Sequence, residues 1–234
     1  MATLAPRTSY DRQRDALTSY FDGTARKAWI DLTSDAKVGG IRATVRAGRE
    51  RMRATLLDWL PADLRRARLL DAGCGTGALS VDAAWRGAEV TAIDVAAGLI
   101  DIARDRSPSF MGHGRIDWRT GDMLDPALGR FDHVAAMDSL IHYSAADMVA
   151  SLASLAERTE RSIVFTFAPW TPLLGAMHMA GKLFPRGNRS PAIVPIAEAD
   201  LRDRLASLSG WRIGRSQRIM SGFYTSHTLE LVRR

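Results

Sequence analysis

The residues most able to do chemistry in this sequence are a glycine run and the aspartates that follow short apolar segments. Residues 69–77 read Leu-Leu-Asp-Ala-Gly-Cys-Gly-Thr-Gly. A glycine turn between a strand and a helix lets the backbone approach a nucleotide, because a Cβ atom there would block the approach. Asp94 follows Gly73 by 21 residues (94 − 73). At the end of a second strand, its carboxylate can accept hydrogen bonds from both hydroxyl groups of a ribose.

Two classes of nucleotide site fit this pattern. With Ala78, the segment satisfies the Gly-x-Gly-x-x-Gly/Ala signature of dinucleotide-binding dehydrogenases. Three features favour S-adenosylmethionine as the ligand. Asp71 before the turn suits the amino group of the methionine part, and Asp122 after a third strand suits the amine of the adenine. The chain also leaves no room for the separate substrate domain of a dehydrogenase. The predicted methyl-donor residues are Asp71, Gly73, Cys74, Gly75, Gly77, Asp94, Val95, Asp122, Met123 and Asp138.

Each of these acidic residues also has a purely structural interpretation. Asp71, Asp94 and Asp122 could each cap a turn or the N-terminus of a helix. Their joint position at the ends of three successive strands favours a binding role over three separate caps. Cys74 is interpreted as a small residue that fits the turn, and not as a nucleophile.

Strands must alternate with helices to bring these aspartates together, and the sequence shows that alternation from residue 68 onward. The apolar patterns predict strands at 68–72, 89–93, 116–119, 132–137, 162–167, 211–219 and 223–232, with helices at 77–85, 96–104, 145–157 and 200–208. Such alternation implies right-handed crossovers and a sheet covered on both faces. We therefore predict an α/β protein with a mostly parallel, seven-stranded sheet, the Rossmann-like fold of class I methyltransferases.

Two segments outside the alternation are expected to lie over the site. Residues 1–60 form a predicted N-terminal helical arm, with helices at 11–21 and 40–60, in front of a donor-binding domain at 61–234. The arginines of the second helix are interpreted as a solvated basic face; they are Arg42, Arg46, Arg49, Arg51 and Arg53. An irregular apolar stretch at about 169–192 is a predicted lid.

Composition limits the partners. The 234 residues carry a net charge of +6, which alone would suit a nucleic acid or an anionic surface. However, the Asn/Asp/Ser-Pro-Pro-aromatic motif of nucleobase amine methyltransferases is absent, and Cys74, the single cysteine, lies in the turn. We therefore expect no nucleic acid partner. No apolar run approaches a membrane span of roughly 18 to 20 residues, and no signal-peptide pattern is present, so a cytoplasmic location is expected.

Several less common motifs lie outside the glycine turn. They are Tyr20-Phe21-Asp22-Gly23-Thr24 with Trp29, Lys37-Val38 with Ile41-Arg42 and Thr44-Val45, Asp138-Ser139-Leu140-Ile141-His142-Tyr143, Phe165-Thr166-Phe167-Ala168-Pro169, and Leu183-Phe184-Pro185. With residues 71–80, these motifs resemble the magnesium protoporphyrin IX O-methyltransferases over nearly the whole chain. Ala25 and Arg26 depart from the Tyr-Phe-Asn-x-Thr-Gly-Phe form of oxygenic members, which indicates the bacteriochlorophyll branch.

The resemblance implies a reaction and a set of partners. The methyl group of S-adenosylmethionine would esterify one propionate of magnesium protoporphyrin IX, giving the monomethyl ester and S-adenosylhomocysteine, with no metal held by the protein. Tyr20 and His142 would orient the carboxylate, with His142 able to remove a proton if the acid arrives neutral. A handover from magnesium chelatase and a peripheral contact with the inner membrane are also implied.

Alternatives to these roles remain open. Met177 and Met179 suit a flat apolar macrocycle and Arg186 and Arg189 could pair with propionates, but a lid that only covers the core fits as well. His142 alone reads as a structural histidine, and Tyr20 alone as a packing aromatic. The rival functions are O-methylation of another small apolar molecule, such as a quinone-ring hydroxyl, and non-catalytic binding of S-adenosylmethionine as a scaffold.

Overall fold

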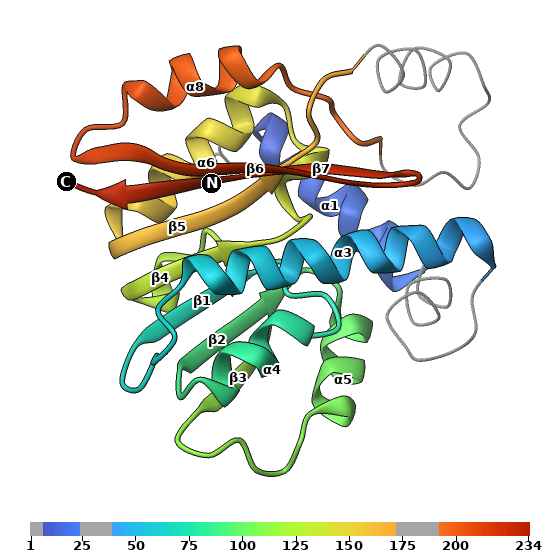
Figure 1. Cartoon of the computed structure of the whole chain (residues 1–234), viewed down its shortest axis with the longest axis vertical. Coiled ribbons are helices and arrows are strands. Elements are labelled where there is room, and N and C mark those ends of the chain that lie inside the picture. Colours follow the sequence, from blue (N-terminus) through green and yellow to red (C-terminus); the bar gives the residue numbers. More distant parts are fainter. Residues whose placement is uncertain (1–6, 24–38, 172–191) are drawn as a thin grey trace, which may run out of the picture.

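A computed structural model describes residues 7–23, 39–171 and 192–234 (Figure 1). The helices are α1 (Ser9–Asp22), α3 (Gly40–Trp59), α4 (Ala78–Trp85), α5 (Ala97–Arg106), α6 (Ala145–Glu157) and α8 (Glu198–Ala206), with short 3-10 turns η1 (Pro126–Leu128) and η2 (Leu140–His142). The strands are β1 (Arg68–Ala72), β2 (Glu89–Asp94), β3 (Arg115–Thr120), β4 (Phe131–Ala136), β5 (Thr159–Phe167), β6 (Trp211–Ser221) and β7 (Tyr224–Arg233).

The strands form one sheet in the order β3-β2-β1-β4-β5-β7-β6. The first five strands in that order are parallel, and β7 runs antiparallel to both β5 and β6. The predicted seven-stranded, mostly parallel sheet is therefore confirmed. Strand order reverses between β1 and β4, and ligands of open α/β sheets bind outside the carboxyl ends of the strands at such a point.

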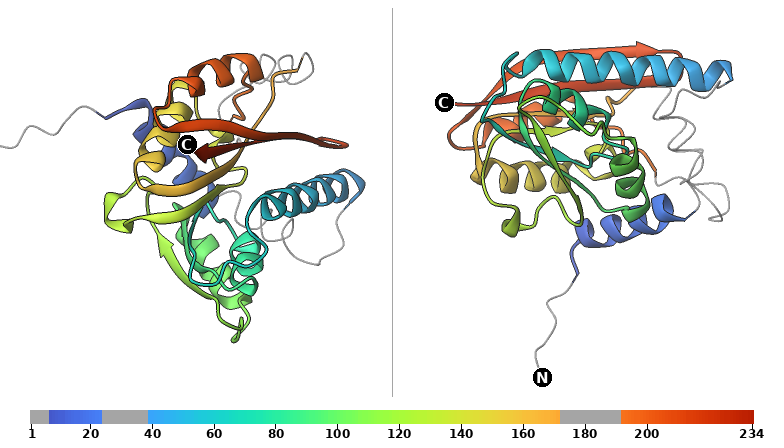
Figure 2. Two further views of the ribbon diagram at one scale, coloured as in Figure 1. Left: turned by 60° about the vertical axis from the view of Figure 1, so that its left-hand side comes forward. Right: turned by 90° about the horizontal axis from the view of Figure 1, so that it is seen from below.

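Two apolar clusters sandwich the sheet. On one face, α3 and α4 bury Met52, Leu56 and Leu79 against β1, β2 and β5. On the other face, α6 and α8 bury Met148, Leu152 and Leu201 against β4, β5 and β7, and Leu17 of α1 joins this second cluster. The α1 and α3 helices therefore reach the carboxyl edge of the sheet from opposite sides (Figure 2).

Strand boundaries depart most from the sequence pattern at β5. The apolar run predicts a start at residue 162, but the strand begins at Thr159, which pairs with Phe131 of β4. Glu160 and Arg161 are exposed, so their backbone extends the ladder while their side chains face solvent. Hydrophobicity alone misses strand residues of this kind, because it reports burial and not backbone pairing.

Candidate active site

The glycine turn after β1 is fixed against the end of β2. The N–H groups of Gly73 and Cys74 both donate to the carbonyl oxygen of Ile93, at 2.9 and 3.0 Å. Gly73 has φ +82°, and a Cβ atom there would lie 2.3 Å from the Cβ of Ser139. The turn therefore requires glycine at this position, both for the backbone angle and for the close approach of the β4 end.

Asp94 is the last residue of β2, and its carboxylate is hydrogen-bonded to the glycine turn. One carboxylate oxygen accepts from the N–H of Gly75 at 2.8 Å, and the other accepts from the N–H of Ala96 at 3.0 Å. Burial raises the pKa of Asp94, an effect that these two backbone donors oppose. Each carboxylate oxygen can accept more than one hydrogen bond. The structural role as a cap and a binding role toward ribose hydroxyls are therefore compatible in one residue.

Asp71 is a buried carboxyl group facing the same space. It is 1% exposed, and it accepts a hydrogen bond from the hydroxyl of Ser80 at 2.6 Å. Burial raises the pKa of Asp71 to about 7, and the neighbouring charge of Asp94 adds to that shift. A cation bound beside it would favour the ionised form. Asp71 is thus suited to a positively charged ligand group.

These residues line one cavity of about 280 Å³ at the carboxyl edge of the sheet. It contains the following predicted site residues: Asp71, Gly73, Cys74, Gly75, Asp94, Val95, Met123, Asp138 and His142. The hydroxyl of Ser139, also on the cavity, is buried and has no hydrogen-bond partner within the described residues. An unsatisfied buried hydroxyl of this kind is costly unless a ligand or water completes it.

Three predicted residues do not line the cavity. Gly77 forms the last corner of the turn at φ +82°, where a Cβ atom would lie 2.2 Å from the ring of Trp118. Tyr20 lies outside, while Leu17 and Phe21 of the same helix reach in. Asp122 lies between two lining residues, Gly121 and Met123, but its own carboxylate is directed elsewhere.

Asp122 instead anchors the first helix. It accepts from the hydroxyl of Tyr10 at 2.6 Å and from the guanidinium of Arg14 at 2.8 Å. It also accepts from the N–H of Leu124 at 2.8 Å, which is the local turn expected of a structural aspartate. The adenine contact proposed from the sequence therefore has three competing partners in this structure.

The α1 helix brings aromatic side chains next to Tyr143 and His142. Tyr10 stacks on Tyr143 with ring centroids 4.9 Å apart, and Phe21 meets His142 edge-on at 6.2 Å. His142 lies in η2, directly after β4, and is 8% exposed. An apolar wall on one side of His142 would exclude water from any carboxylate placed beside it.

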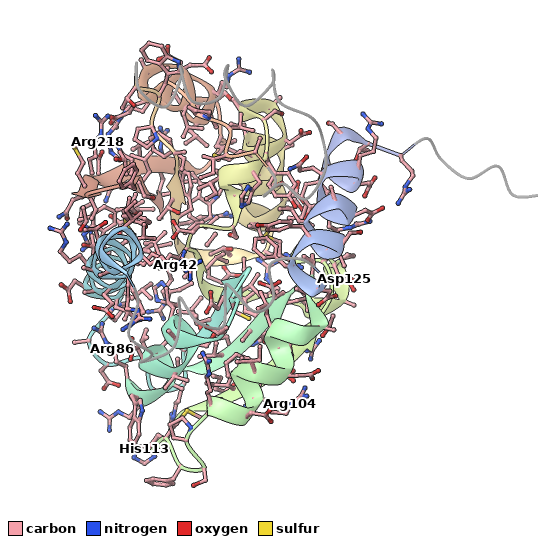
Figure 3. All side chains as sticks on the ribbon, turned by 90° about the vertical axis from the view of Figure 1, so that its right-hand side faces the viewer. Arg42, Arg86, Arg104, His113, Asp125 and Arg218 are labelled. Atoms are coloured by element: carbon pink, nitrogen blue, oxygen red, sulfur yellow. The ribbon has the colours of Figure 1, made fainter. Side chains whose placement is uncertain are left out.

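The basic face of α3 corrects the sequence interpretation. Arg46, Arg49 and Arg53 line the cavity, so this part of the helix is not a solvated surface. Their spacing of three and four residues places them on one stripe, which was the signal available in the sequence. In Figure 3, α3 is seen end-on and α1 lies across the molecule from it. Arg42 and Arg51 remain exposed, as predicted.

Asp138 lines the cavity, but its carboxylate ties three elements together. It pairs with Arg49 of α3 at 2.5 Å, and the hydroxyl of Tyr224 in β7 donates to both its oxygens at 3.1 and 3.2 Å. Its backbone N–H donates to the hydroxyl of Thr166 in β5 at 2.7 Å. The side chain is 4% exposed, and φ is +54°, an unusual angle for a residue with a side chain. Asp138 thus joins α3, β5 and β7 at the segment that leads into Ser139.

Some predicted site residues fall outside the described part of the chain. These are Met177, Met179, Arg186 and Arg189, with most of the predicted lid. Across residues 7–23, 39–171 and 192–234, no group of three or more His, Cys, Asp or Glu side chains is arranged to hold a metal ion. Nor does any helix in those ranges have the length and apolar character needed to cross a bilayer.

Two family models match the chain. One, described as the magnesium-protoporphyrin IX methyltransferase C-terminus, matches residues 136–233, and a methyltransferase domain model matches residues 69–161. The magnesium-protoporphyrin O-methyltransferase of Rhodobacter capsulatus is 48% identical over 95% of this chain and 98% of its own length. The protein of that name from Synechocystis is 31% identical over 92% of this chain and 94% of its own length.

A solved structure also matches the fold over nearly the whole chain. The crystal structure of magnesium protoporphyrin IX methyltransferase from Synechocystis with bound S-adenosylhomocysteine superposes with a TM-score of 0.82. It is 29% identical to this chain and covers 94% of it, and the match spans 99% of that structure. The similarity therefore extends over nearly the whole chain and is not confined to the glycine turn.

Proposed function

The chain belongs to the magnesium-protoporphyrin O-methyltransferase family, and from this premise we propose that it esterifies one propionate of magnesium protoporphyrin IX. It is an S-adenosylmethionine-dependent methyltransferase, and its products are the monomethyl ester and S-adenosylhomocysteine. The observation that carries the proposal is the 48% identity to the Rhodobacter capsulatus relative over nearly the full length of both proteins.

The residues around the cavity fit the methyl donor. The bare backbone at Gly73 leaves the space beside Ser139 that a side chain would fill. The Ser139 hydroxyl, which has no hydrogen-bond partner among the residues that the structure describes, lies beside that space. Asp94 retains acceptor capacity for a ribose. Asp71 supplies a negative charge for the ammonium group, because a cation beside it stabilises its ionised form. These are the roles we propose for the donor-binding residues.

The chemistry needs little acid–base assistance from the protein. When bound, S-adenosylmethionine supplies an electrophilic methyl group on a positively charged sulfur. A propionic acid titrates near a glutamate, at about 4.3, so the acceptor is already an anion at neutral pH. A carbon–oxygen bond forms as the carbon–sulfur bond breaks, and no proton moves. The protein contributes by alignment and by excluding water.

We propose that His142 and Tyr20 orient the reacting carboxylate. His142 lines the cavity beside Ser139, and its ring is held edge-on to Phe21. Tyr20 follows one turn after Leu17 on α1 but does not line the cavity, so its role requires a shift of the last turn of α1. In this scheme residues 1–60 serve as the arm over the donor-binding domain at 61–234.

A single-turnover assay tests the function. Methyl-labelled S-adenosylmethionine and magnesium protoporphyrin IX are mixed with excess protein, and the label is expected in one porphyrin ester. If the true acceptor were a quinone-ring hydroxyl, no methylated porphyrin would form. Methylation of a phenolic quinone would instead rise with pH as its hydroxyl ionises. A non-catalytic scaffold would bind S-adenosylhomocysteine but leave the label on the donor.

We place the reaction in bacteriochlorophyll synthesis as part of the proposal. The identity is 48% to the Rhodobacter capsulatus relative, against 31% to Synechocystis and 29% to Arabidopsis thaliana. A handover of substrate from magnesium chelatase is proposed on the family resemblance alone. It predicts faster esterification of porphyrin delivered by the chelatase than of the same porphyrin added free.

A peripheral membrane contact is proposed at the tip of the β6–β7 hairpin. Met220 and Phe223 are 65% and 67% exposed there, and Ile41 at the start of α3 is 60% exposed. Arg51 bonds the carbonyl oxygen of Met220, so basic and apolar side chains share this tip. Large exposed apolar groups next to arginines suit an anionic bilayer surface. Co-sedimentation with phosphatidylglycerol vesicles should weaken in Phe223→Ser and remain unchanged in Phe110→Ser, which is exposed elsewhere.

A further inference from the structure

Three arginines on one stripe of α3 form a basic wall of the cavity, called the arginine wall below. Within the described residues, the cationic guanidinium side chains on the cavity are those of Arg46, Arg49 and Arg53. Seven residues of helix separate the first from the last, which is about 10 Å along the axis. The wall is therefore long enough to serve two ligand groups at different points along α3.

Contacts along α3 show which end of the wall lies next to α4. Arg53 pairs at 2.9 Å with Asp82 of α4, the helix that continues the glycine turn. Arg49 pairs at 2.5 Å with Asp138 at the end of β4. Both guanidinium groups thus pair with aspartates of the described fold. Arg46 is the next residue of the stripe toward the N-terminus.

Arg46 lies at the end of the arginine wall that is nearer the β6–β7 hairpin turn. Thr44 meets the hairpin turn at Gly222, and Gly48 packs against Tyr224, so the helical turn that carries Arg46 lies beside the hairpin tip. Figure 1 shows this end of α3 extending past the ends of β1 and β2 along the hairpin. Along the helix, Arg46 is therefore farther from the Arg53–Asp82 contact than Arg49 is.

Resting on the proposed function, we propose that Arg46 binds the propionate that is not methylated. The substrate carries two propionates, both ionised at neutral pH. The reacting one must reach the donor methyl group beside Ser139 and His142. The second propionate then lies near the hairpin end of the arginine wall. There the guanidinium of Arg46 can form the bidentate hydrogen bonds that suit a carboxylate. Arg46 is thus a specificity-determining residue.

This assignment explains why transfer stops after one ester. After the first transfer the reacted group is a neutral ester. A second transfer would require the remaining carboxylate to leave Arg46 and enter the reacting position, with the ester facing the guanidinium in its place. That arrangement replaces a charge-assisted pair by a weaker neutral contact. Loss of Arg46 should therefore relax both the choice of propionate and the limit of one methyl group.

The experiment is a product analysis on the full chain with S-adenosylmethionine and magnesium protoporphyrin IX. In Arg46→Met, the KM for the porphyrin is expected to rise about tenfold or more, since a charge-assisted pair is lost. Chromatography with mass spectrometry should then detect a second monoester isomer and the diester. The Kd for S-adenosylhomocysteine, measured by calorimetry, should stay within about twofold of wild type.

Matched variants separate a specificity role from a structural one. Arg46→Lys keeps the charge and should retain a single monoester with an intermediate KM. Arg42→Met removes an exposed arginine of the same helix, labelled in Figure 3, and should match wild type. Arg46→Gln provides the same product analysis if Arg46→Met does not fold.

Two results would overturn the inference. One is a single wild-type monoester from both Arg46→Met and Arg46→Gln. The other is a loss confined to S-adenosylhomocysteine affinity, which would assign Arg46 to the donor's carboxylate. Failure of the wild-type protein to esterify the porphyrin at all would instead contradict the proposed function, so the two failures are distinguishable.

Discussion

The two sides of the cavity are built in different ways. The proposed donor side consists of Asp71, residues 73–76 and Asp94, and its hydrogen bonds run between the turn and the adjoining end of β2. The acceptor side consists of α1, α3 and residues 138–143, and it is held by contacts such as Arg49–Asp138 and Asp138–Tyr224, which join residues 89 and 86 positions apart. One side is a local motif, and the other is a product of tertiary packing.

This difference has consequences for how each side responds to change. On the donor side, Asp94 fixes the turn, and we propose that the same carboxylate binds the ribose hydroxyls. On the acceptor side, no residue acts alone, because helix, strand end and hairpin position one another. We therefore expect donor-side substitutions to affect one ligand strongly. Acceptor-side substitutions should affect stability and porphyrin binding together.

The largest expected effect is on the donor side. Asp94→Ala removes two charge-assisted hydrogen bonds to ribose hydroxyls, and the Kd for S-adenosylhomocysteine should rise about a hundredfold. Isothermal titration calorimetry measures it. Asp101→Ala, an exposed aspartate on α5, serves as the control and should bind like wild type. A rise of less than about threefold in Asp94→Ala would remove Asp94 from the donor site.

The next effect tests the packing of the acceptor side. In Gly48→Ala, the new Cβ atom would lie 2.4 Å from the ring of Tyr224, so α3 must move away from the hairpin. The free energy of unfolding in urea should fall by about 1 to 3 kcal/mol, and porphyrin KM should rise. Gly40→Ala adds the same atom into open space on the same helix and should not destabilise. Equal stability of the two variants would contradict the packing account.

The pH dependence of donor binding should be smaller. The pKa of Asp71 is about 7 in the free protein, and a bound ammonium group favours the ionised form. Affinity for S-adenosylhomocysteine should therefore rise about eightfold from pH 6 to pH 7.5, with release of a proton. Asp71→Asn should bind with no such slope. A slope that survives in Asp71→Asn would assign the titration to another group.

The same shift also sets the sign of an effect on stability. Asp71 binds its proton more tightly in the folded state, with a pKa of about 7, than in the unfolded chain, near 3.9. Its contribution to stability is thus complete below about pH 4 and is lost as the pH rises toward 7. Asp71→Asn should show a flatter decline in the free energy of unfolding over that range.

The smallest effect concerns the hydrogen-bond network around Asp138. Tyr224→Phe removes a hydroxyl that donates to Asp138 while keeping the ring against Gly48. The free energy of unfolding should fall by about 1 kcal/mol, and kcat should decrease modestly because Ser139 and His142 are less well fixed. Donor affinity should not change. A change in donor affinity without a change in kcat would show that the network serves the donor side instead.

The sequence predicts the donor side of the cavity better than the acceptor side. The strands, the glycine turn and the position of Asp94 depend on short-range patterns, so their bounds in the structure lie close to those expected. The orientation of Arg46 and Arg49 depends on which face of α3 meets β6 and β7, and helical spacing alone does not determine that. Likewise, the partners of Asp122 come from α1, more than a hundred residues earlier.

The most direct test of the division is one paired titration. S-adenosylhomocysteine and magnesium protoporphyrin IX are each titrated into wild type, Asp94→Ala and Arg46→Met under the same conditions. The account predicts a crossed result, in which Asp94→Ala loses affinity for the nucleoside alone and Arg46→Met loses affinity for the porphyrin alone. Equal weakening of both ligands in both variants would contradict it.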